Sequence, residues 1–238
     1  PSIVPHPRPI TIPMQQTRDT TRVMDMHGRT IETEDAEAQR ALKQQWRKDA
    51  LAKRKKTTIA QRQEAGRLLA IRARETALVR PGSTVAAFVS MGSEIPMTPL
   101  LETLFDMDCR VLVPRLGAGM EIGWSELDGI DGLRDQHNAD GSVNTHRPQE
   151  PDNAADGPEA LAEAELVIVP AFAVDEHGFR LGRGGGWYDR ALLRRSATAR
   201  VIAVCWPWET TDTTVPHEPH DIPVDGTLTP DGYHAVRG

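Results

Sequence analysis

The apolar positions near the start of the chain predict two amphipathic helices. Between residues 38 and 55, Leu42, Trp46 and Ala50 recur every fourth position, which gives one apolar stripe on an otherwise charged helix. A second helix is predicted over residues 59–78, because Thr57-Thr58 supplies a cap and Pro81-Gly82 a stop. Its inward-facing residues are expected to be Leu68, Leu69 and Ile71.

Short apolar runs further along the chain predict strands. They lie at residues 84–89, 110–114, 166–170 and 200–205, and a more exposed strand is expected over residues 117–125, ending near Trp124. Helices are predicted between them, one with Thr98-Pro99 as its N-cap and first position and one beginning near Trp187. This alternation favours an α/β fold with a mostly parallel sheet flanked by helices.

Two segments interrupt the pattern. Residues 1–36 mix prolines, threonines and charges without an apolar period, so we expect a poorly ordered N-terminal extension before a single catalytic domain over residues 37–238. Residues 128–158 are rich in Gly, Asp, Asn and Pro, which predicts a loop that covers or borders a site.

Composition narrows the classes of function. The net charge is −6, which argues against a broad nucleic-acid interface. No run of about 18 apolar residues and no signal-peptide layout occur, so we expect a cytoplasmic monomer with no membrane partner and a small-molecule substrate. Cys109 and Cys205 lie in apolar runs and are interpreted as buried thiols, not as a disulfide or a metal site.

The stretch RLGRGGGWYD at residues 180–189 has the chemistry of an anion-binding loop. Its four glycines allow positive φ and let backbone N–H groups approach a phosphate, and Arg180 and Arg183 add positive charge. The pattern is neither the dinucleotide fingerprint nor a Walker loop, and a flexible turn remains the alternative. Asp189 could meet the phosphate through Mg²⁺ or serve only as a helix-dipole partner.

A second cationic element is the pair Lys43 and Arg47. Their spacing of four places both on one face of the first helix, where they can converge on one anion. A solvated basic face on a surface helix is the alternative interpretation.

The string GFRLGRGGGWYDR at residues 178–190 resembles the signature of the 5-formyltetrahydrofolate cyclo-ligase family, also called 5,10-methenyltetrahydrofolate synthetases. Further family features follow the same order: the basic helix, FVSMGSE at residues 88–94, Val113-Pro114, and DIPVD at residues 221–225. The resemblance spans about residues 40–228.

The resemblance implies a three-layer fold of the NagB/RpiA/CoA-transferase-like kind. It also implies ATP- and Mg²⁺-dependent conversion of 5-formyltetrahydrofolate to 5,10-methenyltetrahydrofolate with release of ADP and phosphate. In that reaction the formyl oxygen attacks the γ-phosphate, and N10 then attacks the activated formyl carbon before phosphate leaves. Catalysis of such a transfer rests mainly on positioning and charge stabilisation.

The resemblance also assigns roles to individual residues. Val89 and Glu94 match folate positions, Asp189 and Asp221 match magnesium positions, and Arg183 to Trp187 match positions that touch the folate as well. The ATP contacts it implies are Lys43, Arg47, Arg180, Leu181, Gly182, Arg183, Gly184, Gly185, Gly186, Trp187 and Tyr188. Arg183, Lys43 and Arg47 are the cations expected to assist phosphoryl transfer.

Several positions keep a structural alternative. Glu94 could be a surface charge, Asp221 a turn former, and Trp187 and Tyr188 packed aromatics. His177 is interpreted as an exposed turn residue, because the transfer needs no protein base.

The chain departs from the family pattern at two positions. Tyr is usual where Trp187 stands, and some relatives carry Lys at the position of Gly185. Two other functions stay open: a non-catalytic nucleotide- or folate-binding protein, and a related ATP-using enzyme for a different N-formyl substrate.

Overall fold

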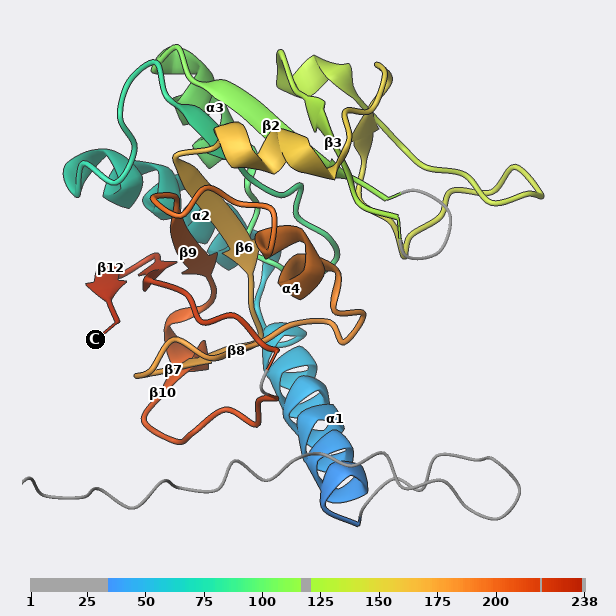
Figure 1. Ribbon diagram of the computed structural model, residues 1–238, viewed down its shortest axis with the longest axis vertical. Helices are drawn as coiled ribbons and strands as arrows, with labels where there is room; N and C mark the ends of the chain where they lie inside the picture. The colour runs from blue at the N-terminus through green and yellow to red at the C-terminus, as the bar shows by residue number, and fades with distance from the viewer. Residues whose placement is uncertain (1–33, 117–120, 219, 237–238) are drawn as a thin grey trace, which may run out of the picture. The chain divides into compact units, whose positions relative to one another are not determined.

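Apolar strands assemble a parallel sheet at the centre of the protein (Figure 1). The structure is a computed structural model that describes residues 34–116, 121–218 and 220–236. Within these ranges the main sheet has seven strands in the order β12-β11-β9-β6-β1-β2-β3. They are β1 (Thr84–Ala86), β2 (Arg110–Arg115), β3 (Gly123–Glu126), β6 (Leu166–Pro170), β9 (Arg200–Val204), β11 (Gly226–Thr229) and β12 (Gly232–Ala235). The edge strands β3 and β12 pair antiparallel, and the other pairings are parallel.

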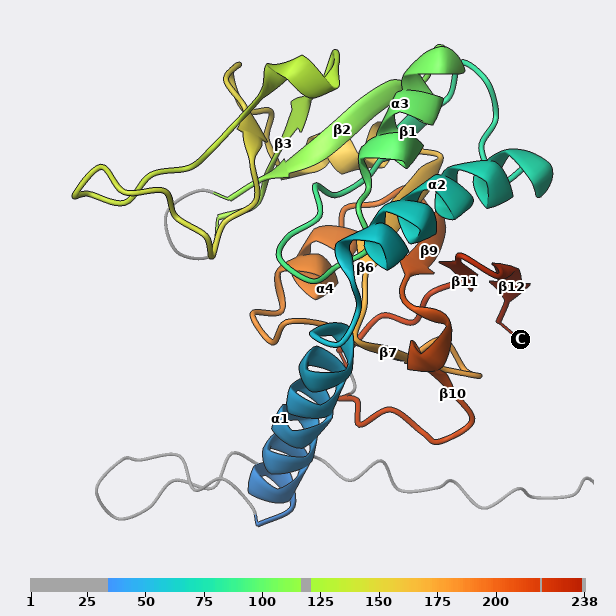
Figure 2. The same cartoon turned by 180° about the vertical axis from the view of Figure 1, so that it is seen from behind.

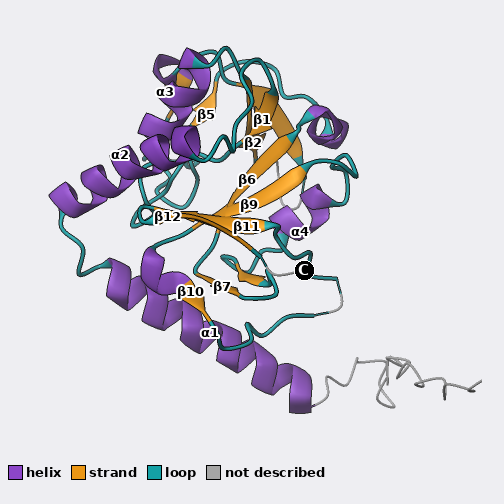
Figure 3. Ribbon diagram, turned by 90° about the vertical axis from the view of Figure 1, so that its left-hand side faces the viewer, coloured by secondary structure: helices purple, strands orange, loops and turns teal. Residues whose placement is uncertain are grey.

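Helices cover both faces of this sheet, which Figure 3 shows edge-on. α2 (Ile59–Glu75) and α3 (Thr98–Asp106) lie on the face turned to the viewer in Figure 2. The opposite face carries the 3-10 helix η2 (Pro158–Glu163) and α4 (Trp187–Leu192). This is the three-layer α/β architecture that the sequence predicts.

The alternation of side chains along each strand builds the two cores. Val111 and Val113 on β2 face α2 and α3, whereas Leu112 between them faces the other core. On β6, Ile168 packs with the first cluster, and its neighbours Val167 and Val169 pack with η2 and α4. Both faces of the sheet are therefore buried, which explains why these strands appear in the sequence as continuous apolar runs.

A second, smaller sheet extends from the end of β6. It has the order β10-β7-β8, with β7 (Ala173–Asp175), β8 (Arg180–Leu181) and β10 (Thr210–Thr211). The remaining short elements are η1 (Ile130–Gly132), β4 (Leu133–Arg134), β5 (Glu150–Pro151) and η3 (Pro207–Glu209). In this sheet, β7 and β8 connect the end of β6 to the glycine-rich loop.

Helix α1 (Glu34–Arg54) is anchored at its C-terminal end by a buried ion pair. Arg54 donates from Nε and Nη2 to the two oxygens of Glu209, at 2.7 and 2.8 Å, and from Nη2 to the carbonyl of Ala171 at 2.6 Å. The two charged side chains are 3% and 2% exposed. Phe172 lies against the guanidinium at 4.4 Å.

Several sequence predictions of elements are confirmed. β6 has the predicted bounds, α4 begins at Trp187, and Cys109 and Cys205 are free buried thiols. Burial raises the pKa of the Cys205 thiol. The exposed position of His177 is also confirmed.

Other predictions of elements are wrong in detail. Leu42 is 47% exposed, because α1 turns its charged side chains and not that residue toward the protein. The second helix ends at Glu75, before Ala77 adopts a φ of 48°. Trp124 is buried and not exposed, because it packs beneath η2 and α4.

The remaining differences concern element ends and the N-terminal segment. α3 begins at Thr98, so Met97 and not Thr98 holds the N-cap position. The first predicted strand stops at Ala86, although residues 87 and 88 stay buried. Residues 1–33 of the predicted extension and residues 117–120 of the predicted strand lie outside the described residues, and α1 already includes residues 34–36.

The Arg54–Glu209 pair generates a stability prediction. Arg54→Met leaves the Glu209 carboxylate buried without its counter-charge, so the free energy of unfolding should fall by about 3–5 kcal/mol in urea titrations. The double variant Arg54→Met/Glu209→Gln should recover part of that loss, since no unpaired charge stays buried.

The exposed pair Arg67–Glu64 is the matched control. Glu64→Gln should leave the unfolding midpoint essentially unchanged, because solvent screens that pair. Equal losses for Arg54→Met and Glu64→Gln would contradict the anchoring role of Arg54.

Candidate functional site

A pocket of about 590 Å³ opens at the carboxyl ends of the central strands. Phe88 and Val89 follow β1, Pro114 lies at the end of β2, and Pro170 ends β6, and all four line the pocket. Strand order reverses here, since β2 lies on one side of β1 and β6 on the other. Open α/β sheets bind ligands at such a switch point.

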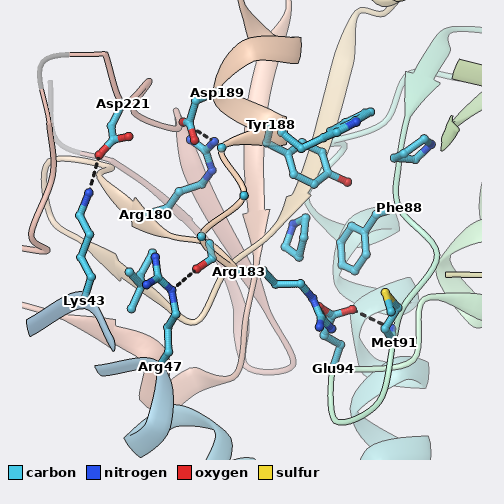
Figure 4. Close-up of a pocket in the computed structure, with 18 of the residues that line it drawn as sticks. Lys43, Arg47, Phe88, Met91, Glu94, Arg180, Arg183, Tyr188, Asp189 and Asp221 are labelled. Atoms are coloured by element: carbon cyan, nitrogen blue, oxygen red, sulfur yellow. Dashed lines mark hydrogen bonds and ion pairs between the residues drawn. The ribbon is translucent and has the colours of Figure 1, made fainter. Parts of the chain in front are cut away.

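Every site residue predicted from the sequence lines this pocket (Figure 4). They come from α1, from the segment after β1, from the glycine-rich loop with the start of α4, and from the segment before β11. They are Lys43, Arg47, Val89, Glu94, Arg180, Leu181, Gly182, Arg183, Gly184, Gly185, Gly186, Trp187, Tyr188, Asp189 and Asp221. Pro148 also lines it, so the segment 128–158 borders the site as predicted.

The glycine-rich loop is held at both ends by arginine side chains. Arg47 donates from Nε to the carbonyl of Gly182 at 2.8 Å, and Arg190 donates from Nη1 to the carbonyl of Gly185 at 3.0 Å. Gly184 and Gly186 adopt φ values of 103° and 60°, where L-residues are strained. α4 has only six residues, so its dipole contributes less to anion binding than the sequence suggests.

α1 presents a polar face to the pocket. Arg40, Lys43, Gln44 and Arg47 follow the spacing i, i+3, i+4, i+7, which places them on one side of the helix. Sequence reasoning missed Arg40 and Gln44, although this spacing from Lys43 and Arg47 would have found them. Partial burial lowers the pKa of Arg47, and its guanidinium remains charged at neutral pH.

Three of the pocket's cations form ion pairs with its carboxylates. Lys43 lies 3.0 Å from Glu218 and 3.3 Å from Asp221. Arg180 lies 2.7 Å from Asp189, and Arg183 lies 3.0 Å from Glu94. Glu218 is a pocket residue that sequence reasoning missed, because its partner is far away in the chain.

Glu94 is 7% exposed and forms the wall opposite α1 (Figure 4). One carboxylate oxygen accepts the backbone N–H of Met91 at 2.7 Å, and the other accepts from Arg183. Burial, together with the negative charge of Glu94, raises the pKa of Tyr188. The Tyr188 hydroxyl therefore stays protonated and can act as a hydrogen-bond donor.

Trp187 joins the pocket to the end of the β2–β3 connection. Its indole Nε1 donates to the carbonyl of Glu121 at 3.2 Å, and its ring packs edge-on against Trp124 and Tyr188 at 5.3 and 4.9 Å. A tyrosine side chain has no N–H, so this hydrogen bond depends on the indole of Trp187.

The chemistry of the carboxylates fits a hard cation shared with a phosphate. The described residues contain no group of three or more His, Cys, Asp or Glu side chains that could hold a metal by themselves. Mg²⁺ commonly takes only one or two carboxylates and completes its shell with phosphate oxygens and water. Asp189 and Asp221, both at the pocket, supply that number.

Fold and site together define a class: an α/β protein with a glycine-rich, cationic loop and a buried glutamate around one pocket at the carboxyl ends of its parallel strands. A comparison with known protein families identifies the chain more specifically. Residues 39–230 match the sequence model of the 5-formyltetrahydrofolate cyclo-ligase family, and the chain belongs to this family. It is accordingly an ATP-dependent ligase of folate one-carbon metabolism.

Individual relatives agree with this assignment. A 5-formyltetrahydrofolate cyclo-ligase of Mycolicibacterium smegmatis is 38% identical over 162 residues, which cover 66% of this chain and 78% of the relative. The Escherichia coli K12 protein of the same name is 29% identical, over 75% of this chain and 94% of the relative.

Solved structures support the fold. The Aquifex aeolicus 5,10-methenyltetrahydrofolate synthetase superposes with a TM-score of 0.66 at 24% identity, covering 83% of this chain and 94% of that chain. The Mycoplasma pneumoniae synthetase gives 0.58 at 18% identity, over 79% and 98%. No helix in the described part of the chain is long and apolar enough to cross a membrane.

The glycine-rich loop generates a prediction with an internal control. A Cβ at Gly184 would lie 3.2 Å from Cζ of Arg47 on a backbone with positive φ. Gly184→Ala should therefore cost about 1–3 kcal/mol of unfolding free energy and raise the KM for ATP by displacing Arg47.

Gly185 lacks a positive φ, and a Cβ there would meet nothing within 4 Å. Gly185→Ala should change the unfolding free energy by no more than about 0.5 kcal/mol, and Gly185→Lys should fold normally. Thermal unfolding and ATP titrations of the three variants test this, and an intact KM in Gly184→Ala would count against the loop geometry.

Proposed function

We propose that this pocket binds ATP against the glycine-rich loop and α1, and 5-formyltetrahydrofolate against Glu94 and Val89, and closes the folate ring between them. The observation that carries this proposal is the arrangement of Glu94 and the loop cations around one cavity. Arg183 lies between the two regions, because it belongs to the loop and its side chain reaches Glu94.

The chemistry requires the formyl oxygen to become a leaving group. That oxygen attacks the γ-phosphorus of ATP and releases ADP. N10 then bonds to the formyl carbon and loses its proton, and the oxygen departs with the phosphate. The net change is 5-formyltetrahydrofolate and ATP to 5,10-methenyltetrahydrofolate, ADP and phosphate.

The protein's part in this transfer is positioning and charge. Lys43, Arg47 and Arg183 surround the loop and can stabilise charge that develops on the γ-phosphate. Glu94 is a planar two-oxygen acceptor that suits the N–H edge of a pterin. The Tyr188 hydroxyl, which stays protonated, adds a hydrogen-bond donor to the pocket lining.

Asp189 and Asp221 are the residues we propose for Mg²⁺, which when bound would neutralise phosphate charge during the transfer. Binding of the metal nucleotide would then exchange ion-pair partners, because Lys43 can pass from Asp221 to a phosphate while Asp221 turns to the metal. Such an exchange keeps every buried charge compensated.

The direct test measures the near-ultraviolet absorbance of the methenyl product. Purified protein mixed with 5-formyltetrahydrofolate, ATP and Mg²⁺ should give a rise in absorbance that depends on ATP. Asp189→Asn should lower the rate by about 100-fold, because losing even a group that only orients a metal ligand costs about 10- to 100-fold.

Controls separate the alternatives. Folate binding without any rise in absorbance would favour a storage protein, and ATP hydrolysis without methenyl product would favour another N-formyl substrate. Glu64→Gln, at an exposed ion pair that does not line the pocket, should leave the rate unchanged.

A further inference from the structure

Arg180 differs from the other arginines of the glycine-rich segment in how its side chain is used. It lies on β8 at the entry to the loop, and its side chain is only 4% exposed. By contrast, the side chain of Arg183 is 50% exposed. Arg180 is therefore largely enclosed by protein, whereas Arg183 is accessible to a ligand.

The guanidinium of Arg180 joins two segments that are far apart in the chain. Nη2 donates to Oδ1 of Asp189 at 2.7 Å, and Nη1 donates to the carbonyl of Ile222. The same Asp189 oxygen also accepts the backbone N–H of Ile222 at 3.4 Å. Asp189 belongs to the first turn of α4, and Ile222 directly follows Asp221 (Figure 4).

These contacts form a triangle between a strand, a helix and the segment before β11. Asp221 is held on its other side, because its Oδ2 accepts the N–H of Glu218 at 2.8 Å and the ammonium of Lys43. The spacing between the carboxylates of Asp189 and Asp221 thus depends on the buried, planar guanidinium of Arg180. Lysine could not replace it, since a single ammonium cannot direct two fixed donors to two acceptors.

We propose that the Arg180 side chain is a positioning residue that sets the relative placement of Asp189 and Asp221, and not a phosphate ligand. The inference rests on the proposed function, which gives these two aspartates to the divalent cation. Turning Arg180 toward a phosphate would break both contacts and leave the carbonyl of Ile222 and the partly buried Asp189 carboxylate without their donor, which is unfavourable. Arg183 has a half-exposed side chain and is therefore the arginine of this segment that is accessible to a phosphate.

The test compares Arg180→Lys with Arg183→Lys. Mn²⁺ binding in the presence of ADP, followed by electron paramagnetic resonance, reads the metal site without turnover. Arg180→Lys should weaken Mn²⁺ binding by about 10- to 100-fold, the usual effect of losing a group that orients a metal ligand. Arg183→Lys should leave Mn²⁺ binding near the wild-type value.

The Kd for ATP measured in EDTA, without a divalent cation, should rank the two variants in the opposite order. Arg180→Lys should leave the metal-free Kd for ATP within about twofold, whereas Arg183→Lys should weaken it. In rate measurements, Arg180→Lys should raise the Mg²⁺ concentration for half-maximal rate while excess Mg²⁺ restores most of kcat. In the double variant Arg180→Lys/Asp189→Asn, the loss of Mn²⁺ affinity should be less than additive, because both changes act on one ligand.

Each outcome decides the inference. Weaker metal-free ATP binding in Arg180→Lys, or unchanged Mn²⁺ binding, would overturn the positioning role while leaving the proposed function intact. A wild-type protein that binds no Mn²⁺ with ADP would overturn the proposed metal site and the inference together. Thermal unfolding of Arg180→Lys shows whether the variant is folded, and Arg180→Gln repeats the measurements without any cation.

Discussion

The buried ion pair between Arg54 and Glu209 fixes the helix on which one side of the site is built. Arg54 is the last residue of α1, and its guanidinium also binds the carbonyl of Ala171 just after β6. The pair therefore ties α1 to the end of the central strand and to η3. Lys43 and Arg47 face the pocket because the end of their helix is held in this way.

The site is assembled from segments that the sheet brings to one edge. β1, β2 and β6 end there, and the small sheet carries the chain from β6 to the glycine-rich loop. Because the order of strands reverses between β1 and β6, the loops that follow them diverge and leave a pocket at this edge of the sheet. The rigid strands set positions, and the loop and α1 supply charge.

The sequence predicts the parts of this arrangement that local chemistry determines. β6 is recognisable because both its faces are buried, and the loop is recognisable because glycine allows backbone conformations that other residues avoid. Strands of two or three residues, such as β7 and β8, are too short to show a recognisable alternation of apolar and polar residues. The apolar stripe predicted for α1 is confirmed at Trp46 and Ala50, which pack against a small core cluster, and is wrong only at Leu42, which is exposed.

The pairing within the site could not be predicted for a related reason. Lys43 meets Glu218, and Arg183 meets Glu94, only after the chain has folded, since each pair joins distant segments. Residue type and spacing indicate which side chains can bind anions, but not which carboxylates pair with those side chains in the ligand-free protein. The role inferred for Arg180 depends on that information alone.

The internal ion pairs also bear on how a charged ligand first meets the protein. Lys43, Arg180 and Arg183 each lie beside a carboxylate, and the whole chain carries a net charge of −6. Paired charges largely cancel beyond a Debye length of about 8 Å at physiological ionic strength. Encounter with an anionic nucleotide therefore gains little from long-range steering, and discrimination in favour of it arises at contact with the pocket.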